Sequence, residues 1–315
     1  MEYAKILVNQ VFIMFLLILV GFFLYKIKMI SDSTNRQLTS IVLYVVTPAL
    51  IIKTYQMNYD AAQAKNMLLG FLLSSISIVA AILFSHILRY KSKKESLETE
   101  RFGVIFTNCG FMAIPLMEAL FGSIGVFYCN TYLTMFNLIL WTYGIKLMNH
   151  KQEPKKKKSI KESLKPFLTP TMISIVVGLM MYFFGIKLPS PFKKATDFIA
   201  NMNTPLAMMV SGVYIAQSNL LAAIKKLRVY YVAIIKCFLL PVLIMSMFKL
   251  FPLDNMLLTT ILISSSCPTA ATTMLLASKF ERDVETASNI FTMTTLMCII
   301  SLPIVIYFAQ AFVFI

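Results

Sequence analysis

Residues 107–115 read TNCGFMAIP and interrupt an apolar stretch that runs from 102 to 121. Residues 264–273 read SSSCPTAATT and interrupt a second apolar stretch at 255–278. Proline removes a backbone donor and frees a carbonyl, while asparagine, serine and threonine bring polar groups into an otherwise apolar segment. We therefore predict two helices that are broken near their middle. The simpler alternative is an ordinary proline kink whose backbone groups are satisfied by neighbouring hydroxyls.

The composition places both segments in a membrane. The chain has 315 residues, of which 58% are hydrophobic and 14% charged, and its mean hydropathy is +0.75. Soluble domains are about 45–50% apolar and about 25% charged. There is too little polar surface to cover a water-soluble core. The sequence therefore indicates an integral membrane protein, and it excludes disordered, fibrous and disulfide-rich secreted classes.

Ten apolar stretches are long enough to cross a bilayer, which takes about 20 helical residues. They are 6–25, 38–56, 67–88, 102–121, 124–147, 167–185, 196–216, 229–250, 255–278 and 286–312. None alternates every second residue as barrel strands do, so we predict an all-α protein. The five cysteines lie inside these stretches, where we expect them to be buried and reduced: Cys109, Cys129, Cys237, Cys267 and Cys298.

Lysine and arginine set the expected orientation. The gaps after the odd-numbered stretches carry 21 of these residues, whereas the opposite side with both termini carries 7. Because the more basic side faces the cytoplasm, we expect both termini outside and a basic cytoplasmic linker at 148–166. Membrane topology thus explains the net charge of +15. We expect membrane lipid as a partner, and no nucleic acid.

Two motifs recur at a spacing of 157 residues, which is half of the chain. Val20-Gly21 corresponds to Val177-Gly178, and Thr47-Pro48 corresponds to Thr204-Pro205. Each half, 1–147 and 167–315, would contain five spans. Because five is odd, the halves would face opposite ways across the membrane. Inverted repeats of this kind are typical of secondary transporters, whose substrates bind near the midplane where helices are broken.

With these residues the chain resembles the auxin efflux carrier family. The most specific match places Asn108 seven residues before Pro115 and is followed by Phe121-Gly122; Pro48, Pro268 and Pro303 also fit. The resemblance implies ten helices in two inverted repeats, with the fourth and ninth crossing at their breaks. It implies a scaffold domain (helices 1, 2, 6 and 7) and a transport domain (helices 3–5 and 8–10), in a homodimer. It also implies elevator-type transport of organic anions, with Asn108 contacting the substrate carboxylate and Pro115 as the crossover proline.

The polar residues near the breaks suit a carboxylate. No Asp or Glu lies deep in an apolar stretch, whereas carriers of cations usually need one there. Amides, hydroxyls and helix N-termini bind anions instead. The candidate substrate-binding residues are Asn108, Cys109, Gly110, Pro115, Ser265, Ser266, Pro268, Thr269, Thr47, Pro48, Asn203 and Asn137. Trp141 is an interfacial anchor or a further lining residue.

Lys236 is the one basic residue well inside an apolar stretch. The first interpretation is that its side chain snorkels outward to the cytoplasmic surface. The alternative is a role near an anion path or a domain interface. His86 and His150 lie at the edges of stretches and are poor candidates for a proton relay.

We expect a secondary transporter of small organic anions, namely mono- or dicarboxylates of malate, malonate or auxin type, and no enzyme. No metal-site, nucleotide-binding or hydrolase motif is visible in the sequence. No cofactor is expected, and coupling to H⁺ or Na⁺ stays open. The alternatives are a transporter-like receptor or sensor, a sodium-coupled carrier of the bile-acid type, and a channel.

Overall fold

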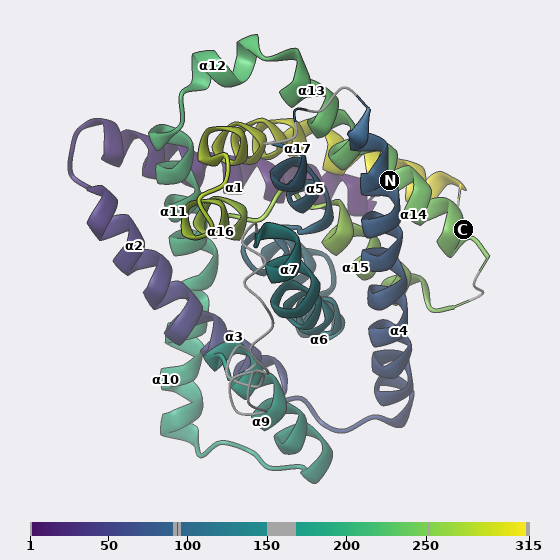
Figure 1. The fold of residues 1–315 in the computed structure, drawn as a ribbon. Helices are drawn as coiled ribbons and strands as arrows, with labels where there is room; N and C mark the ends of the chain where they lie inside the picture. The colour runs from purple at the N-terminus through teal and green to yellow at the C-terminus, as the bar shows by residue number, and fades with distance from the viewer. Residues whose placement is uncertain (1, 91–92, 94–95, 150–167, 251–252, 313–315) are drawn as a thin grey trace, which may run out of the picture.

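The structure is a computed structural model that describes residues 2–90, 93, 96–149, 168–250 and 253–312. In this part of the chain every regular element is a helix, joined by one isolated β-bridge (Figure 1). The predicted basic linker at 148–166 lies almost wholly outside the described residues, as does His150. The all-α prediction is confirmed for the described residues.

The first half of the chain forms three long helical spans and the first broken one. Its elements are α1 (Glu2–Lys26), α2 (Asp32–Ile41), η1 (Val42–Val46), α3 (Thr47–Thr54), α4 (Ala61–Phe84), η2 (Ser85–Arg89), α5 (Leu97–Ile105), η3 (Cys109–Ala113), α6 (Ile114–Ile139), η4 (Leu140–Gly144) and α7 (Ile145–Met148). Here η2 is a 3₁₀ turn, and η1, η3 and η4 are π-helical.

The second half contains the shorter helices and the second broken span. Its elements are α9 (Pro170–Phe184), α10 (Ser190–Asn201), α11 (Asn203–Gln217), α12 (Leu220–Lys225), α13 (Leu227–Ile234), the π-helical η6 (Ile235–Leu239), α14 (Leu240–Phe248), α15 (Asn255–Ser266), α16 (Thr272–Lys279) and α17 (Val284–Phe312).

Six helical segments of the described chain are long and apolar enough to cross a membrane. They are Lys5–Lys26, Asp32–Thr54, Ala61–Arg89, Cys109–Met148, Leu227–Phe248 and Val284–Ala311, and two shorter apolar helices are Pro170–Phe184 and Asn255–Ser266. The chain is a multi-pass membrane protein. The ten predicted stretches do not map one to one onto these segments, because α10 and α11 are separated by a turn at Met202 and the segment Cys109–Met148 runs through the kink at Gly122.

The second span begins earlier than hydropathy predicts. The expected start was residue 38, whereas the helix begins at Asp32. Ser31 caps it by accepting a hydrogen bond from the backbone of Thr34, which is the usual role of serine at a helix N-terminus. Asn35 in this first turn is then buried, and toward the end of α2 the hydroxyl of the buried Thr39 lies 3.2 Å from that of Tyr214. Hydropathy misses such a turn because its buried residues are polar.

Gly122 separates the two parts of α6. Its φ of 61° and ψ of −147° are non-helical, and a positive φ of this kind strains every residue except glycine. The predicted gap between residues 121 and 124 therefore coincides with a real break in the helix geometry.

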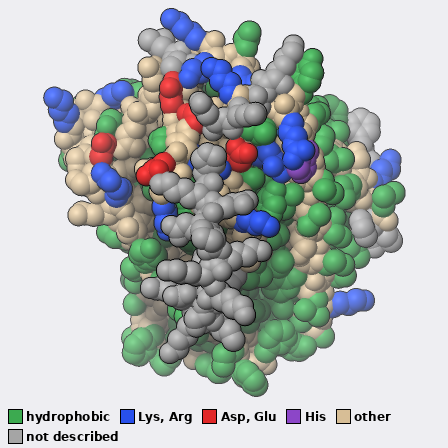
Figure 2. All heavy atoms as spheres, in the orientation of Figure 1, with side chains coloured by type: hydrophobic (Ala, Val, Ile, Leu, Met, Phe, Trp, Pro, Cys, Tyr) green, Lys and Arg blue, Asp and Glu red, His purple; other side chains and the backbone are tan. Residues whose placement is uncertain are grey.

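α5, α6, α7, α15 and α16 occupy the middle of the molecule in Figure 1. α2, α3, α10 and α11 lie on one side of them and α4 and α14 on the other. On the face shown in Figure 2, most acidic and basic side chains gather toward the end where α12 and α13 lie, and hydrophobic side chains cover much of the lower surface. This distribution agrees with a molecule whose apolar belt faces lipid.

α1 and α11 make the most intimate helix contact of the described chain, and two glycines permit it. A Cβ added to Gly21 would overlap the carbonyl oxygen of Met209, and one added to Gly212 would overlap the carbonyl oxygen of Ile18. Membrane helices often pack through small residues because no hydrophobic effect drives them together. The two backbones therefore touch where the side chains are absent.

Candidate functional site

The two predicted interruptions are present, and they cross each other. α5 ends at Ile105 and helical structure resumes at Cys109, while α15 ends at Ser266 and α16 begins at Thr272. We call residues 106–109 and 267–271 the crossover. Asn108 donates its backbone N–H to the Pro268 carbonyl at 2.7 Å, and Ala270 donates to the Phe106 carbonyl at 3.0 Å. This pairing is the one isolated β-bridge of the described residues, Thr107 with Thr269.

The crossover brings four helix ends to one place. Two are C-terminal ends, of α5 and α15, and two are N-terminal ends, of η3 leading into α6 and of α16. Each C-terminal end carries a partial negative charge near half an elementary charge, and each N-terminal end a similar positive one. The buried crossover therefore contains partial negative charge at the ends of α5 and α15 and partial positive charge at the starts of η3 and α16.

Thr269 braces this crossing. Its hydroxyl donates to the Gly103 carbonyl at 2.7 Å, and its backbone N–H donates to the Thr294 hydroxyl of α17 at 3.1 Å. Ser265 and Ser266 both donate their hydroxyl hydrogens to the Leu262 carbonyl of their own helix. The hydroxyls of Thr269, Ser265 and Ser266 therefore already donate their hydrogen to a backbone carbonyl. Each could still accept a hydrogen bond, but none can donate one to a ligand.

Asn108 differs from these hydroxyls because its side-chain donor is free. The residue is 5% exposed, and its Nδ2 is buried with no hydrogen-bond partner in the described part of the chain. Cys109 beside it is fully buried, whereas Gly110 is half-buried, and a Cβ added to it would be in ordinary van der Waals contact with the Leu133 side chain at 3.7 Å. A buried amide donor without a partner costs about 1–3 kcal/mol, which marks a place for an acceptor.

The two predicted prolines, one in each interruption, have different positions. Pro115 is buried at the start of α6, directly after the π-helical turn η3. Pro268 offers its carbonyl to Asn108 across the crossover. Both residues shape the backbone, and neither has a polar side chain to offer a ligand.

Thr47, Pro48 and Asn203 form a separate contact. The Thr47 hydroxyl donates to the Asn203 side-chain oxygen at 3.4 Å, which joins the start of α3 to the start of α11. Asn203 Nδ2 is buried without a partner among the described residues. Because α11 also packs on η3, this pair belongs to an element that contacts the crossover, although within the described part of the chain no hydrogen bond joins it to Asn108.

Asn137 is not brought into the crossover by any hydrogen bond of the described chain. It donates its amide to the Leu133 carbonyl of its own helix at 2.8 Å. Trp141 is half-buried in η4, and its Nε1 is buried without a described partner. The structure therefore groups the candidates into crossover residues, the Thr47–Asn203 pair and these two residues of the fifth stretch.

Lys236 does not snorkel, so the first interpretation is wrong. Its side chain is 0% exposed, and its ammonium donates to the Val104 carbonyl at 2.9 Å and to the Ser265 carbonyl at 3.4 Å. The side chain turns inward because the last carbonyls of α5 and α15 have no partners within their own helices. The buried ammonium lies beside the crossover, and the alternative of a role near an anion path or a domain interface stays a prediction.

Sequence reasoning missed a buried carboxylate. Glu100 is 2% exposed and forms a double contact with Arg228, at 2.6 Å and 3.0 Å. Arg228 also donates to the carbonyls of Leu88 and Tyr90, which end the preceding helix. Glu100 stands just outside the predicted fourth stretch, so hydropathy gave no sign of its burial. The only signal in the sequence is a glutamate two residues before one apolar stretch and an arginine directly before another.

A charged cavity of about 450 Å³ lies beside this ion pair, between α5, α13 and α17. Asp283 lines it and caps α17 by accepting from Thr286, and it also accepts from the Ser96 hydroxyl at 2.7 Å. Burial alone would raise the pKa of Asp283, but the hydrogen bonds from Thr286 and Ser96 and the charge of Lys226 outweigh it and lower the pKa. The carboxylate is therefore charged at neutral pH, and its hydrogen bonds join the start of α17 to the start of α5.

Two arginines near this end connect neighbouring helices. Arg101 donates to the Ser85 hydroxyl and the Tyr143 hydroxyl and lies 3.1 Å from His86 Nε2. Arg282 donates to the Met148 carbonyl at 2.9 Å. His86 is thus tied to an arginine at the end of its span.

The whole chain matches a known family. The family model described as "Membrane transport protein" matches residues 6–306. The chain belongs to this family, that of the auxin efflux carriers. The resemblance inferred from the crossover residues is therefore confirmed. The family consists of membrane transporters, so the chain is a transporter and no enzyme.

Two relatives within the family are similar over nearly their full length. The chain is 27% identical to the uncharacterized transporter MJ1031 of Methanocaldococcus jannaschii over 305 residues, covering 91% of this chain and 94% of that protein. It is 20% identical to the uncharacterized transporter YfdV of Escherichia coli over 303 residues, covering 93% of this chain and 95% of the relative. Neither name states a substrate.

Proposed function

We propose that this membrane transporter is a secondary carrier of small organic anions that binds a carboxylate at the crossover. The observation that carries the proposal is the buried, unpartnered amide donor of Asn108. It stands at the N-terminal end of η3, where partial positive charge and backbone N–H groups favour an anion. The N-terminal end of α16 faces the same crossing and adds to the positive potential.

The ligand class follows from the donors that the crossover offers. An amide N–H and helix N-termini suit one carboxylate group, whose two oxygens accept several hydrogen bonds. Small mono- or dicarboxylates of malate, malonate or auxin type are the substrates we propose. A sodium-coupled carrier of the bile-acid type is disfavoured because neither interruption, 107–115 or 264–273, contains an Asp or Glu. A receptor or sensor, the other class of candidate, is separated by the transport assay below.

The proposed architecture is an inverted repeat of two five-helix units, 1–147 and 167–315, that moves as an elevator. Pairing of the repeat-related glycines supports it. Gly21 of α1 closes on α11, and Gly178 of α9, 157 residues later, closes on the ring of Tyr55 just after α3. Each contact thus joins the first helix of one unit to the second helix of the other. These four spans would form the scaffold domain.

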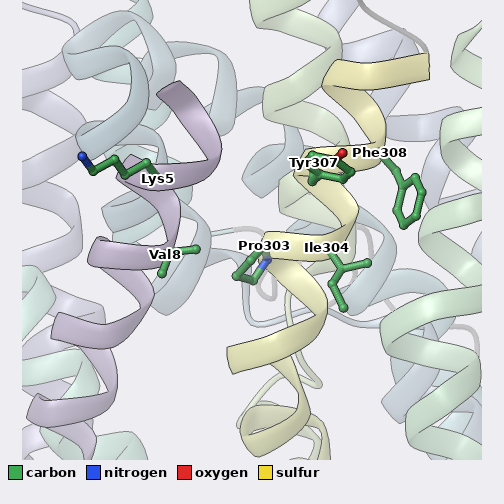
Figure 3. Close-up of a pocket in the computed structure, with 6 residues that line it drawn as sticks. All are labelled: Lys5, Val8, Pro303, Ile304, Tyr307 and Phe308. Atoms are coloured by element: carbon green, nitrogen blue, oxygen red, sulfur yellow. The ribbon is translucent and has the colours of Figure 1, made fainter. Parts of the chain in front are cut away.

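The remaining spans would form the transport domain that carries the crossover. One border between the two domains runs between α1 and α17, where an apolar groove of about 420 Å³ opens (Figure 3). It is lined by Lys5 and Val8 from α1 and by Pro303, Ile304, Tyr307 and Phe308 from α17. An incompletely filled, apolar border suits two bodies that slide, because few polar bonds must be broken. We further propose a homodimer, both termini outside and a cytoplasmic linker at 148–166.

A ligand-binding measurement tests the carboxylate site. The purified protein in detergent is heated with malate, malonate, succinate, lactate, pyruvate and indole acetate, with and without Na⁺. An anion at 100 times its dissociation constant is expected to stabilise the folded state by about 2.7 kcal/mol. The shift is expected to vanish in Asn108→Ala because the amide donor is lost.

Asn137→Ala is the matched control, because its amide is already bonded to Leu133 within one helix. Its ligand shift should equal that of the unaltered chain. A panel with no shift for any anion, or an undiminished shift in Asn108→Ala, would contradict the proposed site.

A further inference from the structure

We propose that the Lys236 ammonium is a tethered cation, which fills a monovalent-cation site at the crossover and makes the carrier independent of Na⁺. The predicted independence of transport from Na⁺ rests on the proposed function as an anion carrier. The cation site itself stands on the contacts of one side chain and can be tested without any substrate.

The ligands of the ammonium are those of a bound alkali cation. Lys236 donates to the carbonyls of Val104 and Ser265, in the last turns of α5 and α15. In broken-helix carriers, freed carbonyls and the C-terminal ends of half-helices are the groups that coordinate a coupling cation. Here a covalently attached positive charge lies against such groups.

Charge balance supports the assignment. Lys236 is 0% exposed, and no carboxylate forms an ion pair with it among the residues that the structure describes. Two helix C-terminal ends together supply close to one negative charge. They are therefore matched to a single positive charge, whether that charge is an ammonium or a bound alkali ion.

The free-energy cost of burying a charged lysine indicates that Lys236 has a role beyond packing. A buried charge is more expensive than an apolar side chain of similar volume, and replacing buried charges by apolar residues is often neutral or stabilising. The residue also sits in the π-helical turn η6, and such turns occur frequently at functional sites. A plain apolar residue here would leave the two carbonyls without a donor and the crossover without a positive charge.

The position of the charge gives it a role in anion binding. The ammonium lies on the C-terminal side of both half-helices, while Asn108 lies on the N-terminal side of the same crossing. Lys236 therefore neutralises the negative ends and leaves the positive ends to the anion. It is a positioning residue, because it acts on the substrate through the helix ends and does not touch it.

Removal of the side chain opens the cation site. Lys236→Ala lacks the three outer carbons and the ammonium, which together correspond to propylammonium. Lys236→Met removes the charge but fills the space. Lys249→Ala is the control, since this exposed lysine ends the same span. The melting temperature of each purified protein is measured in propylammonium, Na⁺ or choline chloride at constant ionic strength.

The unaltered chain and Lys249→Ala are expected to melt at the same temperature in all three salts. Lys236→Ala should melt lower in choline and be raised saturably by propylammonium or Na⁺, whereas Lys236→Met should not respond. Carboxylate affinity should fall roughly tenfold in Lys236→Met, the effect of losing one modest charge interaction. In Lys236→Ala the affinity should recover with propylammonium, which a merely structural role would not produce.

Two results would overturn the proposal. One is a Lys236→Ala protein that no small cation stabilises. The other, measured on the unaltered chain and thus independent of whether the variants fold, is carboxylate binding that needs Na⁺. A chain that binds no carboxylate refutes the proposed function instead, and the cation response of Lys236→Ala still decides the tethered-cation site.

Discussion

Replacement of Gly212 by alanine is expected to lower the free energy of unfolding by about 3 kcal/mol, at the upper end of overpacking costs. The added methyl would overlap the Ile18 carbonyl oxygen and lie 2.9 Å from the Phe22 nitrogen. Both are backbone atoms of α1, so no side-chain rotation relieves the clash. The helices must separate along their shared interface. Thermal or denaturant unfolding in detergent measures the loss.

Gly21→Ala should behave alike, because its methyl meets the Met209 backbone on the opposite helix. The double variant should lose less than the sum of the two single losses, since separated helices accommodate both methyls. Val20→Leu adds volume on the exposed side of α1 and is the control, with a change below about 0.5 kcal/mol. Alanine variants as stable as the unaltered chain would contradict the close α1–α11 contact.

Glu100→Gln is expected to destabilise the protein by about 2 kcal/mol, because it leaves the Arg228 guanidinium without its carboxylate. Breaking a buried pair costs about 3–5 kcal/mol, and we discount this because Arg228 is 26% exposed. The arginine also keeps its bonds to the carbonyls of Leu88 and Tyr90. The change in melting temperature of the purified variant measures the effect.

Glu285→Gln provides the matched control. Glu285 pairs with Lys226 at 2.6 Å, but its side chain is 62% exposed, and exposed ion pairs contribute about 0–1 kcal/mol. Both variants replace glutamate by glutamine. The difference between their losses of stability therefore reflects the difference in burial of the two ion pairs. Equal losses in the two variants would show that Glu100 is not held in the buried pair described here.

Much of the fold was predictable because hydropathy and helix-breaking residues act locally. The two interruptions, the break at Gly122 and the burial of the five cysteines follow from residue types within one segment. Helix starts were less predictable. α2 begins at Asp32 through the Ser31 cap, and its buried polar residues Asn35 and Thr39 look like loop residues to a hydropathy average.

The site was only partly predictable, because tertiary contacts decide which polar atoms remain free. Residue type alone makes Thr269, Ser265 and Asn108 equal candidates, and only the family resemblance distinguishes Asn108; in the structure the two hydroxyls donate to backbone carbonyls, whereas the Asn108 amide donor has no described partner. Lys236 was expected at the surface because hydropathy cannot see the carbonyls of two distant half-helices. Those carbonyls become neighbours only when residues 104 and 265 meet at the crossover.

Counterflow in proteoliposomes tests the central claim most directly. Vesicles containing the purified protein are loaded with the unlabelled carboxylate that gives the largest thermal shift, and entry of the labelled anion is followed with Na⁺ or with choline outside. The account predicts transient accumulation of label, faster than in empty vesicles, equal in both salts and lost in Asn108→Ala. Entry that internal substrate does not accelerate, or that survives in Asn108→Ala, would contradict a carrier that binds its anion at the crossover.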